Sequence, residues 1–220
     1  MYYSIGRSDD NKVIGHYPQT ELKKNPTKGK HYDYFDLRND QFPLKEPYFE
    51  LELLKKAKPT NFLHQFIGLP GWIVDDKLKS ILVNYNLPSH RFYPVLVHQG
   101  NKTFHYHYFH FVIPDCWEFV NKRKSYGEII KMEGGEIILD KNISVNSERE
   151  MIEEIKNYKF PFNIRMGKVF MVKEFNNYDL YFINYFSMVT VISERLKSKI
   201  EEENITGIKM TPWDRIIIEN

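Results

Sequence analysis

The clearest pattern of hydrophobic and polar positions in this chain occurs twice. Residues 74–94, VDDKLKSILVNYNLPSHRFYP, align without a gap on residues 192–212, ISERLKSKIEEENITGIKMTP, at a constant offset of 118. A repeat at a fixed spacing describes architecture before it describes a site, so the sequence predicts two related structural units. Five aligned pairs are identical: Leu78/Leu196, Lys79/Lys197, Ser80/Ser198, Asn86/Asn204 and Pro94/Pro212.

The first copy has the pattern of a strand, a helix and a second strand. An apolar run at residues 72–74 precedes Asp75, whose carboxylate is suited to accept the free amides of a helix's first turn. The sequence Asn-Leu-Pro at residues 86–88 then ends the helix, and residues 91–98 have the composition of a strand. Between these points apolar side chains recur at helical spacing, at Leu78, Ile81, Leu82 and Tyr85.

The second copy predicts the same order of elements with a more polar helix. Residues 189–192 form the apolar run, Ser193 is the expected cap, and residues 208–210 form the returning strand. We expect this helix to be the more exposed of the two, because three acidic residues replace Val83, Asn84 and Tyr85 of the first copy. These residues are Glu201, Glu202 and Glu203.

The rest of the chain predicts mostly strands. One hairpin is expected between residues 92 and 113 with its turn at 99–102, and another between 127 and 139 around Gly134-Gly135. A helix at 147–158 has Ser147 as its expected cap. Further strands are expected at 2–5, 49–53, 169–172 and 178–186, although the KKAK segment after residue 54 could equally continue a helix. A short helix is expected at 62–67, ended by Gly68.

Together these elements predict an α+β fold, mainly antiparallel β-sheet with a few helices and two related strand-helix-strand units. No linker rich in Pro, Gly or Ser separates the halves, so we expect residues 1–220 to form a single compact domain. Within it, residues 1–57 are expected to be less regular, and residues 58–220 contain the repeat.

Composition and charge narrow the class of protein. Charged residues make up 27% of the chain and hydrophobic residues 42%, as in ordinary globular proteins. The net charge of +2 creates no overall field that would attract nucleic acid or an anionic membrane. We expect no secretory signal, because residues 1–15 reach charged and polar positions too early, and no run approaches roughly 18 apolar residues. The single cysteine, Cys116, suits a reducing compartment, so we expect a cytoplasmic protein without a membrane partner.

The most suggestive chemistry lies in the first expected hairpin. His105 and His107 are two residues apart on a strand and would point to one face, with His98 on the partner strand and His110 on the opposite face. Such a set could hold zinc or copper, which makes a metal-dependent hydrolase an alternative function. The segment TFHYHYFHF is more typical of an aromatic ladder, and no carboxylate or cysteine stands nearby at a recognised spacing. We therefore expect no metal and no cofactor.

Two other candidates carry weaker signals. Cys116 is expected to be a small buried hydrophobe, because the neighbours that activate a thiolate are missing from its segment. Lys122, Arg123 and Lys124, with aromatic residues nearby, leave a nucleic-acid-binding module as a further alternative. Three basic residues beside a strand are more often simply solvated, so we expect no nucleic-acid partner.

Four motifs follow one another in an order that resembles a known family. They are KPTNFL, GWIVDDKLKSIL, LPSHRFYPVLV and LYFINYFSMVTVISERLKSKIEEENITGIKM. The order resembles the bacterial polymorphic-toxin immunity proteins of the myxobacterial type, formerly catalogued only as a domain of unknown function. In that family a late hydrophobic strand leads into a Ser-Glu-(Arg/Lys)-Leu helix and a Thr-Gly-(Ile/Val) return, here residues 192–196 and 206–208. The resemblance covers the chain from about Lys58 onward, and Asp75 stands where the family has a serine cap.

The resemblance implies a cytoplasmic antidote, not an enzyme, that binds a cognate toxin domain and neutralises it. Its motifs are structural, with Asp75 and Ser193 as helix caps, and they contain no catalytic residue. Binding is expected to bury a patch of standard size, with aromatic anchors inside a polar rim. Clustered carboxylates would steer a toxin that has a basic cleft. The candidates for this toxin-binding role are Asp75, Asp76, Glu201, Glu202 and Glu203.

Overall fold

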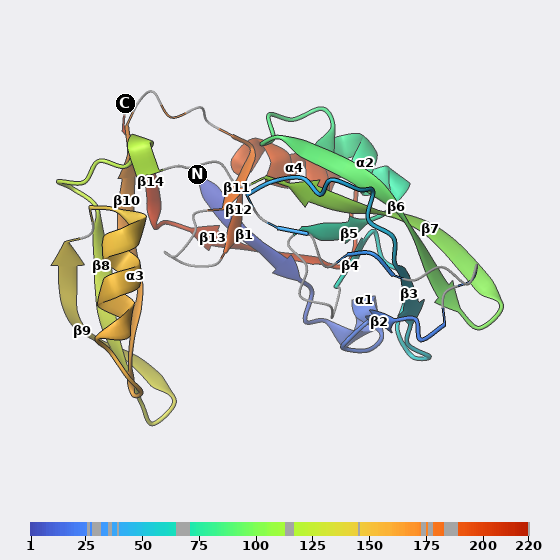
Figure 1. Ribbon diagram of the computed structural model, residues 1–220, viewed down its shortest axis with the longest axis horizontal. Coiled ribbons are helices and arrows are strands. Elements are labelled where there is room, and N and C mark those ends of the chain that lie inside the picture. Colours follow the sequence, from blue (N-terminus) through green and yellow to red (C-terminus); the bar gives the residue numbers. More distant parts are fainter. Residues whose placement is uncertain are drawn as a thin grey trace.

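The computed structural model describes residues 1–25, 27, 32–34, 37–38, 40–64, 71–112, 117–144, 146–172, 175, 178–182 and 189–219. These residues form an α+β fold, mainly antiparallel β-sheet, as the sequence predicts. Figure 1 shows a larger lobe with helices α2 (Asp76–Leu82) and α4 (Glu194–Glu202) and a smaller lobe with helix α3 (Glu148–Lys156). Two shorter elements, α1 (Asn11–Ile14) and the 3-10 turn η1 (Trp117–Phe119), lie in the connections.

Two sheets make up the larger lobe. The six-stranded sheet has the order β2 (Thr20–Leu22), β3 (Glu50–Leu53), β6 (His90–Gln99), β7 (Lys102–Phe111), β5 (Trp72–Val74) and β4 (Phe62–Leu63). The four-stranded sheet beside it has the order β11 (Leu180–Phe182), β12 (Thr190–Ser193), β1 (Tyr2–Arg7) and β13 (Ile208–Trp213).

The smaller lobe contains one sheet, which we call the small sheet. Its order is β14 (Ile216–Ile218), β10 (Phe162–Met171), β8 (Tyr126–Glu133) and β9 (Glu136–Ser144). A hydrophobic cluster joins this lobe to the larger one, because Met151 of α3 and Val169 of β10 are buried in the same cluster as Tyr2 of β1 and Val191 of β12. No helix in the described part of the chain has both the length and the apolar character needed to cross a bilayer.

The repeat is longer in the structure than in the aligned segments. The pairing of β4 with β5 recurs in β11 and β12, because Phe62 lies opposite Val74 as Leu180 lies opposite Ile192. The offset of 118 holds at the start of every element: Phe62, Trp72, Asp76 and His90 for β4, β5, α2 and β6, and Leu180, Thr190, Glu194 and Ile208 for β11, β12, α4 and β13.

The fourth strand of each unit comes from a different part of the chain. In the first unit this strand is β7, which follows β6 directly, whereas in the second it is β1 at the N-terminus. Tyr3 of β1 lies opposite Pro212 as His107 of β7 lies opposite Pro94. The N-terminal strand therefore completes the C-terminal unit, and both units have four strands and one helix.

The expected caps are present at the helix starts. Asp75 Oδ1 accepts a hydrogen bond from the amide of Leu78 at 2.9 Å, and Ser193 Oγ accepts one from Leu196 at 3.2 Å. Ser147 likewise accepts from Glu150 at 3.2 Å. Both expected hairpins are also confirmed, as β6–β7 and β8–β9, with Gly100, Gly134 and Gly135 in their turns at positive φ.

One predicted helix is wrong. The spacing of the apolar residues at 62–67 predicts a helix, yet Phe62 and Leu63 form strand β4. Their backbones pair with Val74 and Ile73, and the Phe62 amide donates to the carbonyl of Thr206 at 3.1 Å. These distant partners outweigh the local pattern. Residues 65–70, with the expected stop at Gly68, lie outside the described residues, as do residues 183–186 of the strand expected at 178–186.

The Thr-Gly-Ile segment at 206–208 joins the two units. Thr206 donates its amide to Asn61 Oδ1 at 2.8 Å, and its hydroxyl lies 2.9 Å from the same oxygen. Gly207 has φ +89°, and a Cβ atom there would lie 2.2 Å from the Phe62 carbonyl oxygen. Only glycine permits this approach. This part of the family-like sequence, residues 206–208, therefore packs the two units against each other.

Asp179 occupies the position in the second unit that Asn61 has in the first. Its buried carboxylate accepts the Asn86 amide at 2.8 Å and the Ser193 hydroxyl at 2.6 Å, and it pairs with Arg195. Burial raises the pKa of Asp179, but the bonds from Arg195, Ser193 and Asn86 outweigh it and lower the pKa overall. Asp179 thus connects the end of α2 to the start of α4.

We expect Asp179→Ala to lower the free energy of unfolding by about 2–3 kcal/mol, because it removes the buried carboxylate that accepts hydrogen bonds from the Asn86 amide and the Ser193 hydroxyl. Asp179→Asn copies the residue of the first unit and should cost about 1 kcal/mol, because the amide oxygen still accepts one bond. Urea denaturation of the two variants measures the difference. An asparagine variant as unstable as the alanine variant would contradict the equivalence of the two positions.

Candidate protein-binding surfaces

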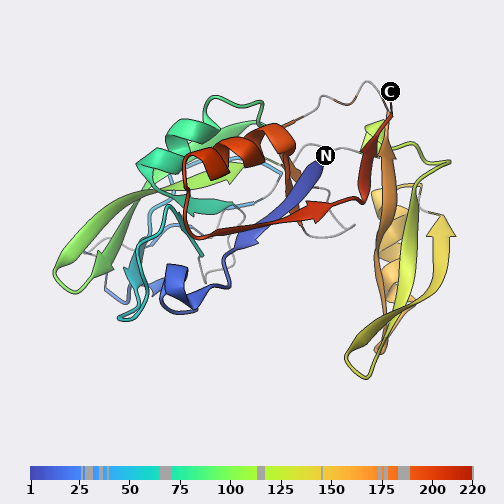
Figure 2. The ribbon, with the colours of Figure 1, turned by 180° about the vertical axis from the view of Figure 1, so that it is seen from behind.

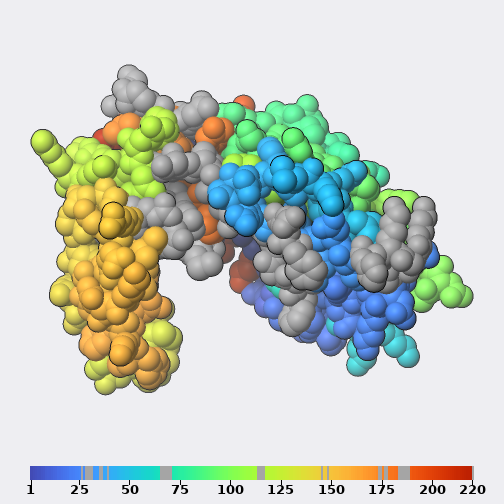
Figure 3. All heavy atoms as spheres, in the orientation of Figure 1, coloured from blue at the N-terminus to red at the C-terminus, as the bar shows by residue number. Residues whose placement is uncertain are grey.

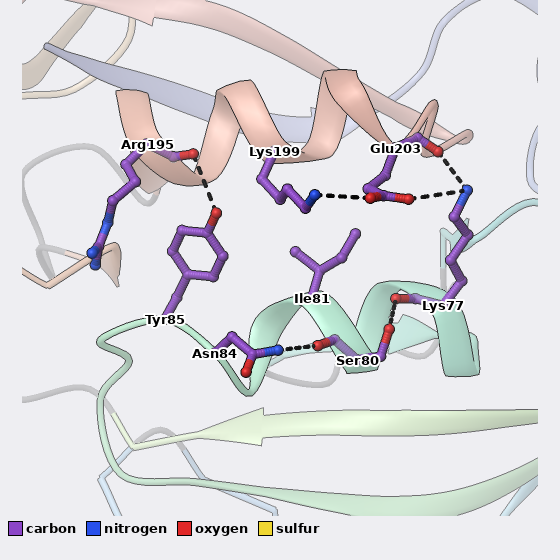
Figure 4. Close-up of a pocket in the computed structure, with 8 residues that line it drawn as sticks. All are labelled: Lys77, Ser80, Ile81, Asn84, Tyr85, Arg195, Lys199 and Glu203. Atoms are coloured by element: carbon purple, nitrogen blue, oxygen red, sulfur yellow. Dashed lines mark hydrogen bonds and ion pairs between the residues drawn. The ribbon is translucent and has the colours of Figure 1, made fainter.

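Helices α2 and α4 lie side by side in opposite directions, with a shallow pocket between them (Figure 4). Lys77 at the start of α2 donates to the carbonyl of Glu203 at the end of α4. At the other end the Tyr85 hydroxyl lies 3.5 Å from the carbonyl of Arg195. Lys77 corresponds to Arg195 and Tyr85 to Glu203 at the offset of 118, so the same two positions of each unit meet across the interface. This is the contact pattern of a twofold pair within a single chain.

Because the start of α2 contacts the end of α4, the helix pair brings the five expected acidic residues to one end, although residues 75–76 and 201–203 are far apart in the sequence. All five already have hydrogen-bond or ion-pair partners. Asp75 is held by the amide of Leu78 and by Asn61 Nδ2, the latter at 2.7 Å, and Asp76 lies 2.6 Å from His107 Nε2. The ion pairs of the second helix are Glu201 with Lys197 at 2.8 Å, Glu202 with Lys199 at 3.2 Å, and Glu203 with Lys199 at 2.8 Å.

The candidate histidines do not converge on a common point. His107 contacts Asp76, His98 lies 2.8 Å from a Glu50 carboxylate oxygen, and His105 is exposed. His110 is buried on the other side of the sheet, with its Nε2 2.6 Å from the carbonyl of Arg38. Burial lowers the pKa of His110. Within the described ranges, no group of three or more His, Cys, Asp or Glu side chains is placed to hold a metal ion.

The second unit provides an internal comparison for His107. At the equivalent position the Tyr3 hydroxyl donates to Glu194 Oε2 at 2.9 Å, and Glu194 corresponds to Asp76. A lysine stands beside each ring, with Lys79 Nζ 3.4 Å from His107 Nδ1 and Lys197 Nζ 5.1 Å from the Tyr3 ring centre. Tyrosine and histidine make the same kind of contact at this position, from a strand to a carboxylate in the first turn of a helix. The contact therefore has a structural role in both units.

We expect protein purified without an affinity tag to contain no stoichiometric zinc or copper, since His98 and His107 have separate carboxylate partners and His105 is exposed. Elemental analysis of the wild-type chain and of His105→Ala measures this. One metal ion per chain in the wild type, lost in the variant, would support the hydrolase alternative instead.

A buried carboxylate that sequence reasoning missed lies behind His98. Glu50 is fully buried, and it accepts the Thr27 amide at 3.1 Å, the Thr27 hydroxyl at 2.6 Å and the Tyr48 hydroxyl. Burial raises the pKa of Glu50, but the bonds from Thr27, Tyr48 and His98 outweigh it and hold the pKa at about 2. We call this set the Glu50 cluster. The sequence shows only an alternating strand at 49–53, which gives no sign that Glu50 points inward.

The Glu50 cluster also places a hydroxyl, an imidazole and a carboxylate in series. His98 Nδ1 lies 3.1 Å from Thr103 Oγ1, on the side of the ring opposite Glu50. This is the order of a hydrolase triad, but Thr103 is exposed at the end of a strand. The pockets beside α2 and α4, beside α3, at the N-terminus and between residues 33 and 47 are lined by other residues. We therefore assign the cluster a structural role.

The basic segment 122–124 forms an exposed turn before β8, and Lys124 pairs with Glu219 at 2.6 Å. Cys116 lies outside the described residues. Neither the basic turn nor the helix pair presents a large apolar surface.

Such a surface lies on the smaller lobe. The β8–β9 turn lies at the lower tip of the smaller lobe in both ribbon views (Figures 1 and 2). Figure 3 shows a hollow between the lower parts of the two lobes. Phe160 is 87% exposed, and its neighbour Pro161 accepts the amide of Met132 at 2.8 Å, which places Phe160 at the same end. Four further large apolar side chains here are 45% to 54% exposed. The hairpin surface, as we call it, consists of Met132, Ile137, Ile138, Leu139 and Phe160.

The strand register decides which face these side chains occupy. Met151 of α3 packs with Ile143 and Ile164, so α3 covers the face of the small sheet that these two share. Met132 lies opposite Ile137, and by strand alternation Leu139 shares their face, which we call the open face. Ile130, opposite Leu139, is buried, and Ile138 points to the α3 face. Figure 2 shows the small sheet with α3 behind it.

No protein-family model matches this chain, and no curated protein is similar to it in sequence. The family resemblance therefore depends on the motif residues alone.

Proposed function

We propose that this protein is an immunity protein that binds and neutralises a cognate toxin domain, and that it does so through the hairpin surface. The observation that carries the binding role is the exposure of five large apolar side chains at one end of the smaller lobe. Exposed apolar groups that cluster in this way mark interaction sites in soluble proteins. The resemblance of residues 192–196 and 206–208 to the immunity family supplies the class of partner.

The hairpin surface has the composition of the centre of a protein interface. Phe160 offers an aromatic anchor, and Met132 an adaptable thioether. Charged side chains flank them, including Lys131, Glu133 and Glu136. An apolar centre within a charged rim is the usual anatomy of an interface that forms between two proteins that are also stable apart.

Co-expression tests the proposal. The chain is produced together with the toxin domain encoded by the gene next to its own, and growth rescue and co-purification are scored. We expect the chain to restore growth and to form a stoichiometric complex. A chain that neither rescues growth nor co-purifies with the toxin domain would remove the proposal.

The acidic end of the helix pair has a secondary place in this function. We expect the double variant Glu201→Lys and Glu202→Lys to slow association with the toxin domain roughly three- to tenfold at low salt, because lysines already offset part of the negative field there. Glu153→Lys, an exposed reversal on α3, is the matched control. Stopped-flow association rates at two salt concentrations measure the effect. Equal rates for all three chains would remove the steering role.

A further inference from the structure

The outer edge of β9 is free. The strand is nine residues long and pairs with β8 on one side. On its other side no strand or backbone hydrogen bond from the described residues meets it. The outward N–H and C=O groups of β9 are therefore open to another chain.

The two halves of this edge differ in chemistry. From Asp140 onward the strand is protected, because the register shifts there and Lys141 and Asn142 are exposed. Bulges and lysines are common devices against unwanted pairing at sheet edges. Residues 137–139, in contrast, present three consecutive exposed apolar side chains beside the same edge. Apolar side chains are thus retained on the one stretch of the strand where an incoming segment would find regular pairing.

We propose that the partner docks by strand addition: an extended segment of the partner protein pairs with β9 and continues the small sheet. This inference rests on the proposed function and specifies how the toxin domain contacts the hairpin surface. Backbone hydrogen bonds would supply affinity, and alternate side chains would supply selectivity. On the open face the segment meets Ile137 and Leu139, so it needs apolar side chains at alternate positions. On the α3 face it meets Ile138 and then Lys141, which favours an acidic residue at the matching position.

A second copy of this chain fits the edge poorly. Antiparallel pairing of β9 with itself, centred on Asp140, would oppose two aspartates, and pairing centred on Ile138 would oppose Glu136 and Asp140. Pairing centred on Leu139 would place Ile137 against Lys141 and Ile138 against Asp140. Each of these registers sets like charges against each other or charged groups against apolar ones. The edge therefore favours a different chain that carries the complementary pattern.

Selection from a displayed library of random decapeptides, used as the probe on the full chain, tests the inference. We expect enriched peptides to alternate apolar and polar residues, with Asp or Glu at a fixed place. Binding of the synthesised peptides is then measured by fluorescence anisotropy on the wild type, Ile137→Pro and Ile138→Pro. Successive strand amides point in opposite directions, so one of the two prolines removes an outward N–H and leaves the β8 ladder intact.

We expect the outward proline to weaken peptide binding at least tenfold while the melting temperature stays unchanged. Hydrogen exchange on the wild-type chain gives a second readout, in which the peptide should slow exchange of amides within residues 136–144. Failure to enrich any peptide, equal binding to both proline variants and the wild type, or protection elsewhere would overturn strand addition. Growth rescue is scored separately, so a chain that rescues without using this edge refutes the docking mode but retains the proposed function. A chain that binds such peptides at β9 without rescuing growth refutes only the function.

Discussion

Replacing Glu50 with alanine is expected to lower the free energy of unfolding by about 3 kcal/mol, the largest stability effect we expect from a single polar side chain here. The carboxylate is fully buried and accepts hydrogen bonds from Thr27, Tyr48 and His98, with Lys23 Nζ 3.9 Å away. Removing it leaves these donors facing a cavity. Urea denaturation followed by tryptophan fluorescence measures the loss.

Two variants control this prediction. Glu52→Ala removes a carboxylate from the same strand, but its side chain is exposed, so the change should stay within about 0.5 kcal/mol. Glu50→Gln keeps the shape and one acceptor oxygen, and should cost about 2 kcal/mol. If Glu50→Ala and Glu52→Ala were equally stable, the Glu50 cluster would have no structural role.

The same cluster predicts a dependence of stability on pH. The folded pKa of Glu50, about 2, lies below its ordinary value of 4.5. A depressed folded value means that the contribution is fully present above pH 4.5 and is lost as the pH falls from there towards 2. We expect the advantage of the wild type over Glu50→Gln, about 2 kcal/mol above pH 4.5, to shrink towards zero as the pH falls to 2, so that the wild-type acid limb is the steeper of the two. Parallel acid limbs for the two chains would contradict the assignment.

The local patterns of the sequence were sufficient for the capped helices and the hairpins. A cap such as Asp75 acts within one turn, and a two-residue turn such as Gly100-Asn101 joins neighbouring strands, so both leave their signal in a short window. The constant offset of 118 adds to these local signals, because an element predicted in one unit is also predicted at the equivalent residues of the other.

The remaining features depend on partners that a short window cannot contain. β4 is a strand because Val74 and Thr206 pair with it, the latter from the other unit. The place of β1 within the second unit depends on β12 and β13, which lie at the far end of the chain. A short window also gives no sign of the role of Glu50, because its partners Thr27 and His98 are distant in the sequence and contact it only in the folded protein. The hairpin surface was missed because a run of apolar residues such as 137–139 normally predicts a buried strand, whereas here these side chains are about half exposed.

That surface carries the largest effect that we expect on binding. The double variant Ile137→Lys and Leu139→Lys should weaken affinity for the toxin domain by about 100-fold or more, because two lysines would have to be desolvated at the centre of an apolar contact. Both side chains are on the open face and more than half exposed, so the fold should tolerate the change with little loss of stability. Isothermal titration calorimetry gives the affinity and a thermal melt the stability.

Val83→Lys is the matched control, because Val83 is 53% exposed, close to the 54% of Ile137, but lies at the end of α2 on the larger lobe. It introduces one lysine, half the charge of the double variant, at an equally exposed aliphatic position on a surface that the proposal leaves free. We expect its affinity for the toxin domain to match the wild type within about twofold, since isolated exposed apolar residues contribute little to binding. If Val83→Lys weakened binding as much as the double variant, or the double variant bound normally, the docking site would lie outside the smaller lobe.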